Sequence, residues 1–254
     1  MSFIDERTVA ELAEEHGVHA DVAKELTGLL RPCVLLVEQK NLPEDSPSTR
    51  PAARSGGLPS LPEDVEWPDG AGPFALTVDC AALPHDWLDI DLPRSGHLLF
   101  FSTFKYEPEN SVVLHVPAGV PTAEREVPKD LDEYESVAYE PKALHPVRGL
   151  TIDHDWRGAP ATAAFEDGRA EGLDGFVEAL VAGVHNGPAP HPVAQVGGFS
   201  NQWQEAPDQD GLVLLAQIAG NGVDHNLFTL NLVVGTREDI AAGLWEGLQF
   251  EQQC

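Results

Sequence analysis

The chain has 254 residues, 42% of them hydrophobic, a composition that is ordinary for a folded protein and excludes disorder throughout. Its 42 acidic side chains against 15 basic ones give a formal net charge of −27, which repels phosphate backbones and argues against nucleic acid as a direct partner. The first residues are acidic, and no window approaches 18 consecutive apolar residues. We therefore expect no secretory signal, no membrane span and a cytoplasmic location.

The three cysteines, Cys33, Cys80 and Cys254, lie far apart and form no CxxC pair. This spacing argues against both a structural zinc site and a disulfide framework. We expect reduced thiols and no cofactor.

Residues 3–30 predict two short helices, because apolar side chains recur at helical spacing on both sides of Gly17. Ser2 and Asp5 have the spacing of a capping box at the start of the first helix. Pro32 is expected to end this N-terminal helical segment, residues 1–31.

Several short apolar runs bounded by Pro or Gly predict antiparallel strands: 33–37, 74–78, 97–101 and 112–116. The polar residues 39–54 predict a loop. Residues 117–146 carry prolines and spread acidic side chains, and we expect a surface excursion with one edge strand there.

A mid-chain helix is predicted from Leu173 to Val184, with His185 at its C-terminal end and a stop at 186–188. Strands are then expected at 212–218, 227–234 and 248–251, and Thr236 with Asp239 caps a short final helix. These elements predict an α+β protein of strand-dominated antiparallel sheets, with N-terminal helices and one mid-chain helix, in a single globular domain, 1–254.

One pair of segments is similar within the chain. Gly56-Gly57, a loop through Trp67 and the strand 74–79 parallel Gly197-Gly198, a loop through Trp203 and the strand 214–218. The pattern predicts an internal duplication, with halves at about 33–150 and 190–254; chance similarity is the alternative. We interpret the glycine pairs as turns with positive φ rather than ligand loops, and both tryptophans as anchors of their loops to the core.

The same segments carry a family resemblance, in the strings GGLPSLPEDVEWP, FALTVDCAALP, LPRSGHLLFF, QVGGF with LLAQI, and FEQQC. They resemble the YwqG-like family of bacterial proteins, a domain of unknown function, over residues 50–105 and 190–254. The resemblance implies a strand-dominated α+β fold with an internal duplication, and it implies no activity. A Gly-Asp element of that family is reduced here to Asp224, so a site built on it is in doubt in this chain.

The triplet His-Asp-Trp occurs twice and supplies the candidate metal or acid-base residues His85, Asp86, His154 and Asp155. If the triplets met, they would offer two imidazoles and two carboxylates to zinc, manganese or iron. Neighbouring residues of a strand point to opposite faces, so the pattern favours isolated surface residues instead. Residues 208–211 predict a turn rather than a calcium loop, because Ala219 occupies the twelfth position.

The charge and the lack of nucleophile or phosphate-binding motifs favour a non-enzymatic module that binds a basic protein partner, in a regulatory or toxin-neutralising role. The alternative is a metal-dependent enzyme or small-ligand-binding protein that uses the four His and Asp residues. A structural or assembly role is a third hypothesis, for which the sequence holds no specific feature.

Overall fold

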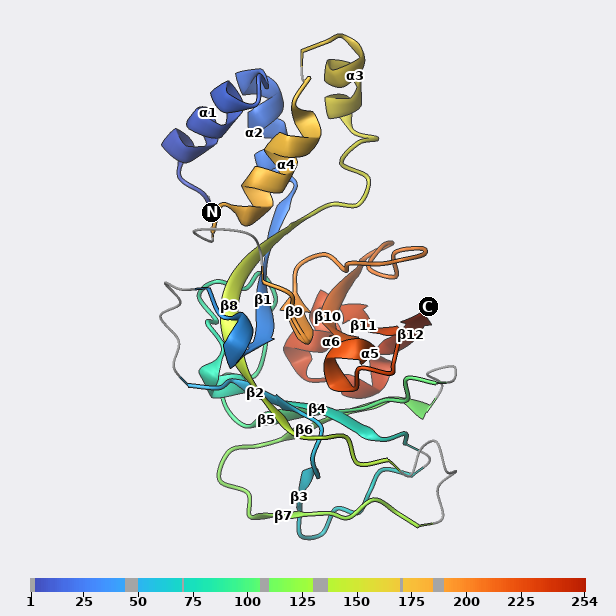
Figure 1. The fold of residues 1–254 in the computed structure, drawn as a ribbon. Helices are drawn as coiled ribbons and strands as arrows, with labels where there is room; N and C mark the ends of the chain where they lie inside the picture. Colours follow the sequence, from blue (N-terminus) through green and yellow to red (C-terminus); the bar gives the residue numbers. More distant parts are fainter. Residues whose placement is uncertain are drawn as a thin grey trace.

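A computed structural model gives the fold and describes residues 3–43, 50–69, 71–105, 110–129, 137–169, 171–184 and 190–254. A ten-stranded antiparallel sheet dominates these residues, and most of the helices gather at one end of it, so the expected strand-dominated antiparallel fold with helices is confirmed (Figure 1). The strand order is β12-β11-β10-β9-β1-β8-β2-β4-β5-β6, and β3 pairs separately with β7.

The strands are β1 (Leu30–Glu38), β2 (Ala53–Ser55), β3 (Ser60–Pro62), β4 (Phe74–Asp79), β5 (His97–Phe101), β6 (Val112–Val116), β7 (Thr122–Glu124), β8 (Lys142–Ile152), β9 (Ala194–Gly197), β10 (Leu212–Ala219), β11 (Leu230–Thr236) and β12 (Gln249–Gln253). The α-helices are α1 (Glu6–Glu15), α2 (Ala20–Gly28), α3 (Pro160–Glu166), α4 (Leu173–Ala182), α5 (Gly220–Val223) and α6 (Arg237–Ala242). Short 3-10 helices are η1 (Gln39–Asn41), η2 (Cys80–Ala82) and η4 (Trp245–Gly247).

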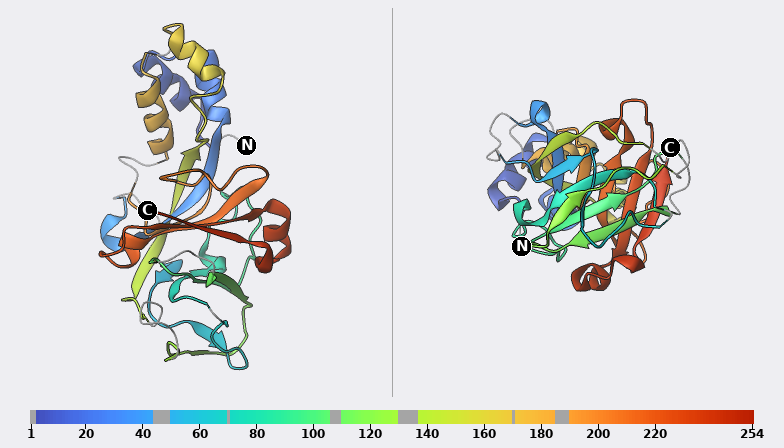
Figure 2. Two further views of the ribbon diagram at one scale, coloured as in Figure 1. Left: turned by 90° about the vertical axis from the view of Figure 1, so that its right-hand side faces the viewer. Right: turned by 90° about the horizontal axis from the view of Figure 1, so that it is seen from below.

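The centre of the sheet is the pairing of β1 with β8, which runs from Leu30 opposite Ile152 to Glu38 opposite Leu144. The sheet curls, so that the arm β9–β12 and the arm β2–β6 face each other across the main core (Figure 2). Both arms contribute buried side chains to that core, among them Leu36, Leu76, Phe100, Leu144, Val196 and Ile218. An amide joins the arms inside it, because Asn231 Nδ2 donates to Ser102 Oγ at 2.7 Å.

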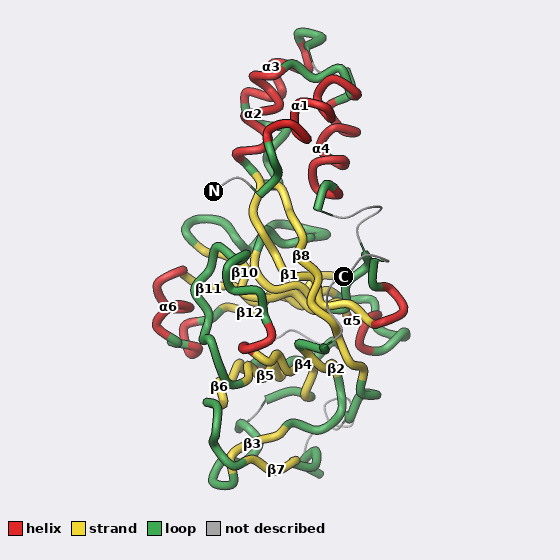
Figure 3. Tube along the Cα trace, turned by 90° about the vertical axis from the view of Figure 1, so that its left-hand side faces the viewer, coloured by secondary structure: helices red, strands yellow, loops and turns green. Residues whose placement is uncertain are grey.

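The helices α1 to α4 form a second core at one end of the molecule, into which β1 and β8 extend (Figure 3). Leu26, Phe176 and Leu180 are fully buried there, and Trp156, just beyond β8, joins them. The β3–β7 pair lies at the opposite end and covers a third cluster that includes Leu61 and Phe101. The β1–β8 ribbon therefore links the helical end to the curled sheet.

The two arms share their strand order and register. A register shift lies between Phe74 and Leu76 where β4 pairs with β5, and another lies between Leu214 and Ala216 where β10 pairs with β11. The grouping differs from the halves expected from the sequence. β1 pairs with β9 of the C-terminal arm, whereas β8 pairs with β2 of the other arm.

Both glycine pairs form turns with positive φ, as expected: 66° and 76° at Gly56 and Gly57, 69° and 78° at Gly197 and Gly198. A side chain clamps each turn in the same way. Arg54 donates to the carbonyls of Gly56 and Leu58 at 2.6 and 2.7 Å, and Gln195 donates to those of Gly197 and Phe199, both at 2.9 Å. These contacts give the glycine pairs a structural role.

The sequence patterns missed several elements, among them β2, β3, β8, β9, α3 and α5. β8 carries Pro146, and β1 carries Pro32 inside the strand rather than before it. Both prolines are tolerated because β2 pairs only with residues 142–144 and β9 only with residues 33–36, so neither proline has a second neighbouring strand. α3 is a short helix opened by Pro160, without a long apolar stripe to reveal it.

Other boundaries shift by a few residues. Asp5 is itself the N-cap of α1 and accepts from the Thr8 N–H at 3.0 Å. β11 begins at Leu230 rather than at 227. Thr236 caps α6 as expected, with its Oγ1 accepting from the Asp239 N–H at 3.0 Å. The Ser2 and His185 expectations, and the stop at 186–188, lie outside the described residues.

The two tryptophans differ. Trp67 is buried and packs edge-on against Phe101, with ring centroids 5.1 Å apart, so the anchoring role expected of it is confirmed. Trp203 is 53% exposed, and the same expectation was wrong there.

In the parts of the chain that the structure describes, no helix is long and apolar enough to cross a membrane.

Replacing Gly198 by Ala should strongly destabilise the fold. An added Cβ would lie 2.6 Å from Thr151 Oγ1 and 2.8 Å from Cys33 Cβ, in a residue with positive φ. We expect a loss of about 3 kcal/mol in the free energy of unfolding, measured by chemical denaturation. Gly168→Ala is the matched control, because φ there is +70° and nothing lies within 4 Å; it should cost only about 1 kcal/mol. Equal losses in the two variants would contradict the close packing of this turn.

Candidate functional site: an acidic groove

A groove of about 690 Å³ lies where β8 leaves the sheet, facing the segment between β9 and β10. One wall carries Asp153, His154 and Asp155, and the other is the segment 199–213, while β1 contributes Arg31 and α6 contributes Arg237. Its lining is mainly polar, as suits a polar ligand.

The segment 199–213 is held in place by side chains of the strands beneath it. Gln217 Oε1 on β10 accepts from the Asn201 N–H at 2.8 Å. Gln253 on β12 is fully buried, and its Oε1 accepts from the backbone N–H groups of Trp203 and Gln204 at 2.7 and 3.1 Å. Its Nε2 donates to the carbonyl of Glu205 at 2.7 Å. Four hydrogen bonds from two side-chain amides thus fix this wall in advance of any ligand.

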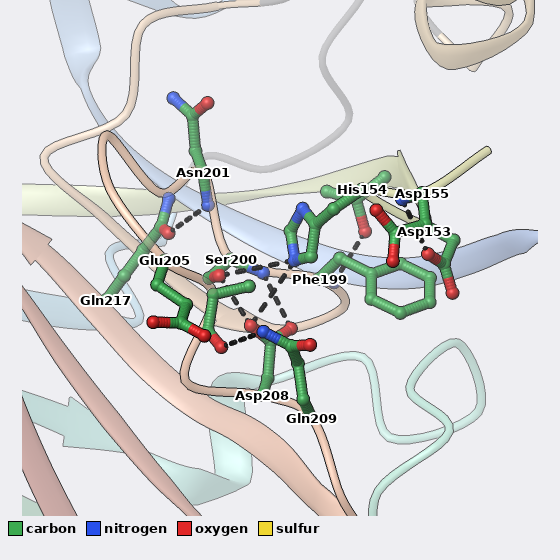
Figure 4. A network of polar contacts seen from close by, with 12 residues as sticks. Asp153, His154, Asp155, Phe199, Ser200, Asn201, Glu205, Asp208, Gln209 and Gln217 are labelled. Atoms are coloured by element: carbon green, nitrogen blue, oxygen red, sulfur yellow. Dashed lines mark hydrogen bonds and ion pairs between the residues drawn. The ribbon is translucent and has the colours of Figure 1, made fainter. Parts of the chain in front are cut away.

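His154, Ser200 and Asp208 meet at the floor of the groove (Figure 4). The Asp208 carboxylate accepts from Ser200 Oγ at 2.5 Å and from the Ser200 N–H at 3.0 Å. His154 Nε2 lies 3.4 Å from Asp208 Oδ1 and 3.5 Å from Ser200 Oγ. The His154 ring also packs edge-on against Phe199 at 5.6 Å.

The Asp208 side chain has no exposed surface, yet its carboxyl group is held in the charged form. Burial raises the pKa of Asp208, but the hydrogen bonds from His154 and Ser200 together outweigh burial, and the pKa lies below its ordinary value of 3.8. Asp208 is therefore a buried anion that ties the two walls together.

The three residues do not form a nucleophilic triad. In such a triad the serine donates to one imidazole nitrogen and the carboxylate accepts from the other. Here the Ser200 hydroxyl donates to the carboxylate, and both Ser200 and Asp208 face the same nitrogen of His154. The N–H groups of Ser200 and Asn201 are already donated to Asp208 and Gln217, so they are not free to bind an oxyanion.

The two arginines of the groove are paired with one carboxylate at its edge. Arg237 donates to the carboxylate of Asp89 at 2.6 Å and also to its carbonyl, and Arg31 lies 3.9 Å from the same carboxylate. Arg31 also stacks on Phe199, 4.2 Å from the ring centroid. Within the described residues, no ion pair engages the other carboxylates that line the groove, which are Asp153, Asp155, Glu205 and Asp210. The groove therefore carries a net negative charge.

The four residues predicted from the His-Asp-Trp triplets have separate partners. His85 Nε2 contacts the Cys80 carbonyl at 2.7 Å, and Asp86 pairs with Arg148 at 2.9 Å. His154 and Asp155 line the groove, where the Asp155 N–H donates to Asp153 Oδ1 at 2.9 Å. Across the described ranges, no three His, Cys, Asp or Glu side chains are grouped to hold a metal ion. The two triplets thus do not make one site.

Sequence patterns missed Ser200 and Asp208 as partners of His154, because they follow it by 46 and 54 residues without a motif.

Residues 208–211 form the expected turn, with positive φ at Asp210 and Gly211. Asp224 also lies in a turn, where its Oδ1 accepts from the N–H and Nδ2 of Asn226 at 2.9 and 3.0 Å.

Asp208→Asn should destabilise the protein in a pH-dependent way. At pH 7 we expect a loss of about 2 kcal/mol, because a buried ionic hydrogen-bond acceptor is replaced by a neutral amide. The folded pKa of Asp208 is depressed, so its stabilisation is fully present above the ordinary value of 3.8 and is lost as the pH falls through the folded pKa. Denaturation of both proteins between pH 7 and pH 3 measures this difference. A loss that stays constant over that range would contradict an ionised Asp208.

A family model with the description "Domain of unknown function (DUF1963)" matches residues 53–242. The match extends from β2 to the end of α6 and includes both facing walls of the groove. The comparison with curated proteins finds no significant match.

Proposed function

The chain belongs to the DUF1963 family, a domain of unknown function, and we propose from the groove itself that the protein binds a basic segment of a partner protein without catalysis. The observation that carries the proposal is the set of four carboxylates around a preformed groove whose two arginines are already paired with Asp89. Basic side chains would meet a negative surface there and would not need to displace a competing cation.

The charge of the whole chain supports the same partner. A formal net charge of −27 attracts a basic protein from a distance. The groove then offers a defined surface on which specific contacts can form. The four hydrogen bonds from Gln217 and Gln253 that fix the wall reduce the ordering needed on binding. In the cytoplasm such a module would act as a regulator or would neutralise a basic toxin.

A small organic polycation carries positive charge like a basic protein segment, but it lacks the length of such a segment. Because the acidic charge of the chain, −27 in all, extends far beyond the carboxylates of the groove, we commit to the protein segment. Spermine therefore serves as a comparison ligand and should bind more weakly than a Lys/Arg-rich peptide. The metal-dependent enzyme hypothesis gains no support from the separate partners of His85 and His154.

We also propose that the chain is a YwqG-like protein of bacterial origin and that its two sheet arms arose by internal duplication. The matching strand order, the two register shifts and the equivalent hydrogen bonds from Arg54 and Gln195 to the Gly-Gly turns support the duplication. Chance similarity would have to reproduce all three features.

The groove proposal predicts that neutralising its acidic residues weakens peptide binding. The variant Asp153→Asn/Asp155→Asn/Glu205→Gln keeps the side-chain shapes and the acceptor at position 153 and removes three charges. We expect it to lower the affinity for a Lys/Arg-rich peptide by roughly tenfold to a hundredfold and to flatten the salt dependence of Kd. Isothermal titration calorimetry at two salt concentrations measures both effects.

The matched control removes three exposed charges near the β3–β7 pair, in Glu63→Gln/Asp64→Asn/Glu66→Gln. If this control lost as much affinity as the groove variant, binding would follow net charge alone and the groove would not be the site.

A further inference from the structure

His154 lines the groove beside the buried carboxylate of Asp208. Its side chain is 18% exposed, and its Nε2 faces the Asp208 carboxylate, which is fully shielded from solvent. Imidazole is the side chain whose charge ordinarily changes between pH 5 and 8. A change of protonation at His154 alters the charge of the groove by one unit.

Charged groups surround His154 from every element of the groove. Its own segment carries Asp153 and Asp155, and the facing segment carries Glu205, Asp208 and Asp210. β1 and α6 contribute the two arginines that pair with Asp89. Carboxyl groups ordinarily titrate near pH 4 and imidazole between pH 5 and 8, and His154 is the imidazole among the residues that line the groove.

We propose that His154 makes the binding of a basic segment pH-dependent, so that protonation of its ring weakens binding and deprotonation strengthens it. This regulation rests on the proposed function of the groove. An imidazolium on the floor neutralises the adjacent Asp208 charge and repels the incoming cations, whereas the neutral ring leaves the groove more negative by one charge.

The coupling is reciprocal. A basic segment that binds the neutral-His154 form more tightly must also promote release of the proton from His154. The regulation therefore has a second readout on the protein itself, in addition to the affinity.

The experiment measures Kd for a Lys/Arg-rich peptide from pH 5.5 to pH 8 with the wild-type protein, with His154→Gln and with His225→Gln. His225 is a matched control because its side chain is 90% exposed and it lies outside the groove lining. We expect wild type and His225→Gln to bind roughly threefold to tenfold more weakly at the acidic end, and His154→Gln to lose that dependence. In NMR spectra at about pH 6.5, the His154 ring signals should move toward the neutral form when the peptide is added.

A pH dependence that persists unchanged in His154→Gln, or ring signals that do not move, would overturn this inference while leaving the groove as a binding site. No peptide binding by wild type at pH 8 would overturn the proposed function and this inference together. The NMR readout follows the His154 ring of the wild-type protein, so it tests the coupling independently of the affinities measured with His154→Gln.

Discussion

The antiparallel pairing of β1 with β8 is the constraint on which the rest of the structure depends. Both arms of the curled sheet start from it, because β9 pairs with β1 and β2 pairs with β8. The ends of the same two strands enter the helical core, where Leu30 and Leu150 are buried. The chain then leaves β8 directly into Asp153 and His154, so this pairing sets one wall of the groove relative to the sheet.

The two arms have similar scaffolds but different surfaces. After Gly56-Gly57 the chain forms β3, which pairs with β7 and covers an apolar cluster. After Gly197-Gly198 the chain instead forms the polar wall of the groove, held by Gln217, Gln253 and Asp208. The same turn therefore leads to a packed layer in one arm and to a candidate binding surface in the other. A function placed in this groove belongs to the C-terminal arm and not to the scaffold that the arms share.

The sequence predicted those features that depend on local patterns. Apolar periodicity gave α1, α2 and α4, and the glycine pairs gave turns with positive φ. It failed for β8, because Pro146 and Gly149 interrupt the strand pattern and the strand depends on its pairing with β1 and, at residues 142–144, with β2. The floor of the groove could not be predicted, since His154, Ser200 and Asp208 are distant in sequence and are brought together by the sheet. The hydrogen bonds that Gln195, Gln217 and Gln253 make to the backbone could not be predicted either, because a buried glutamine has no local sequence signature.

The central claim is that the groove between residues 153–155 and 199–213 binds a basic protein segment. Mapping backbone amide chemical shifts of the isotope-labelled protein during titration with a Lys/Arg-rich peptide tests it most directly. The account predicts that the largest shifts fall on these two segments and on Gln253, which holds the wall. Shifts concentrated on α1 and α2, on the β3–β7 pair, or spread evenly over the acidic surface would contradict it.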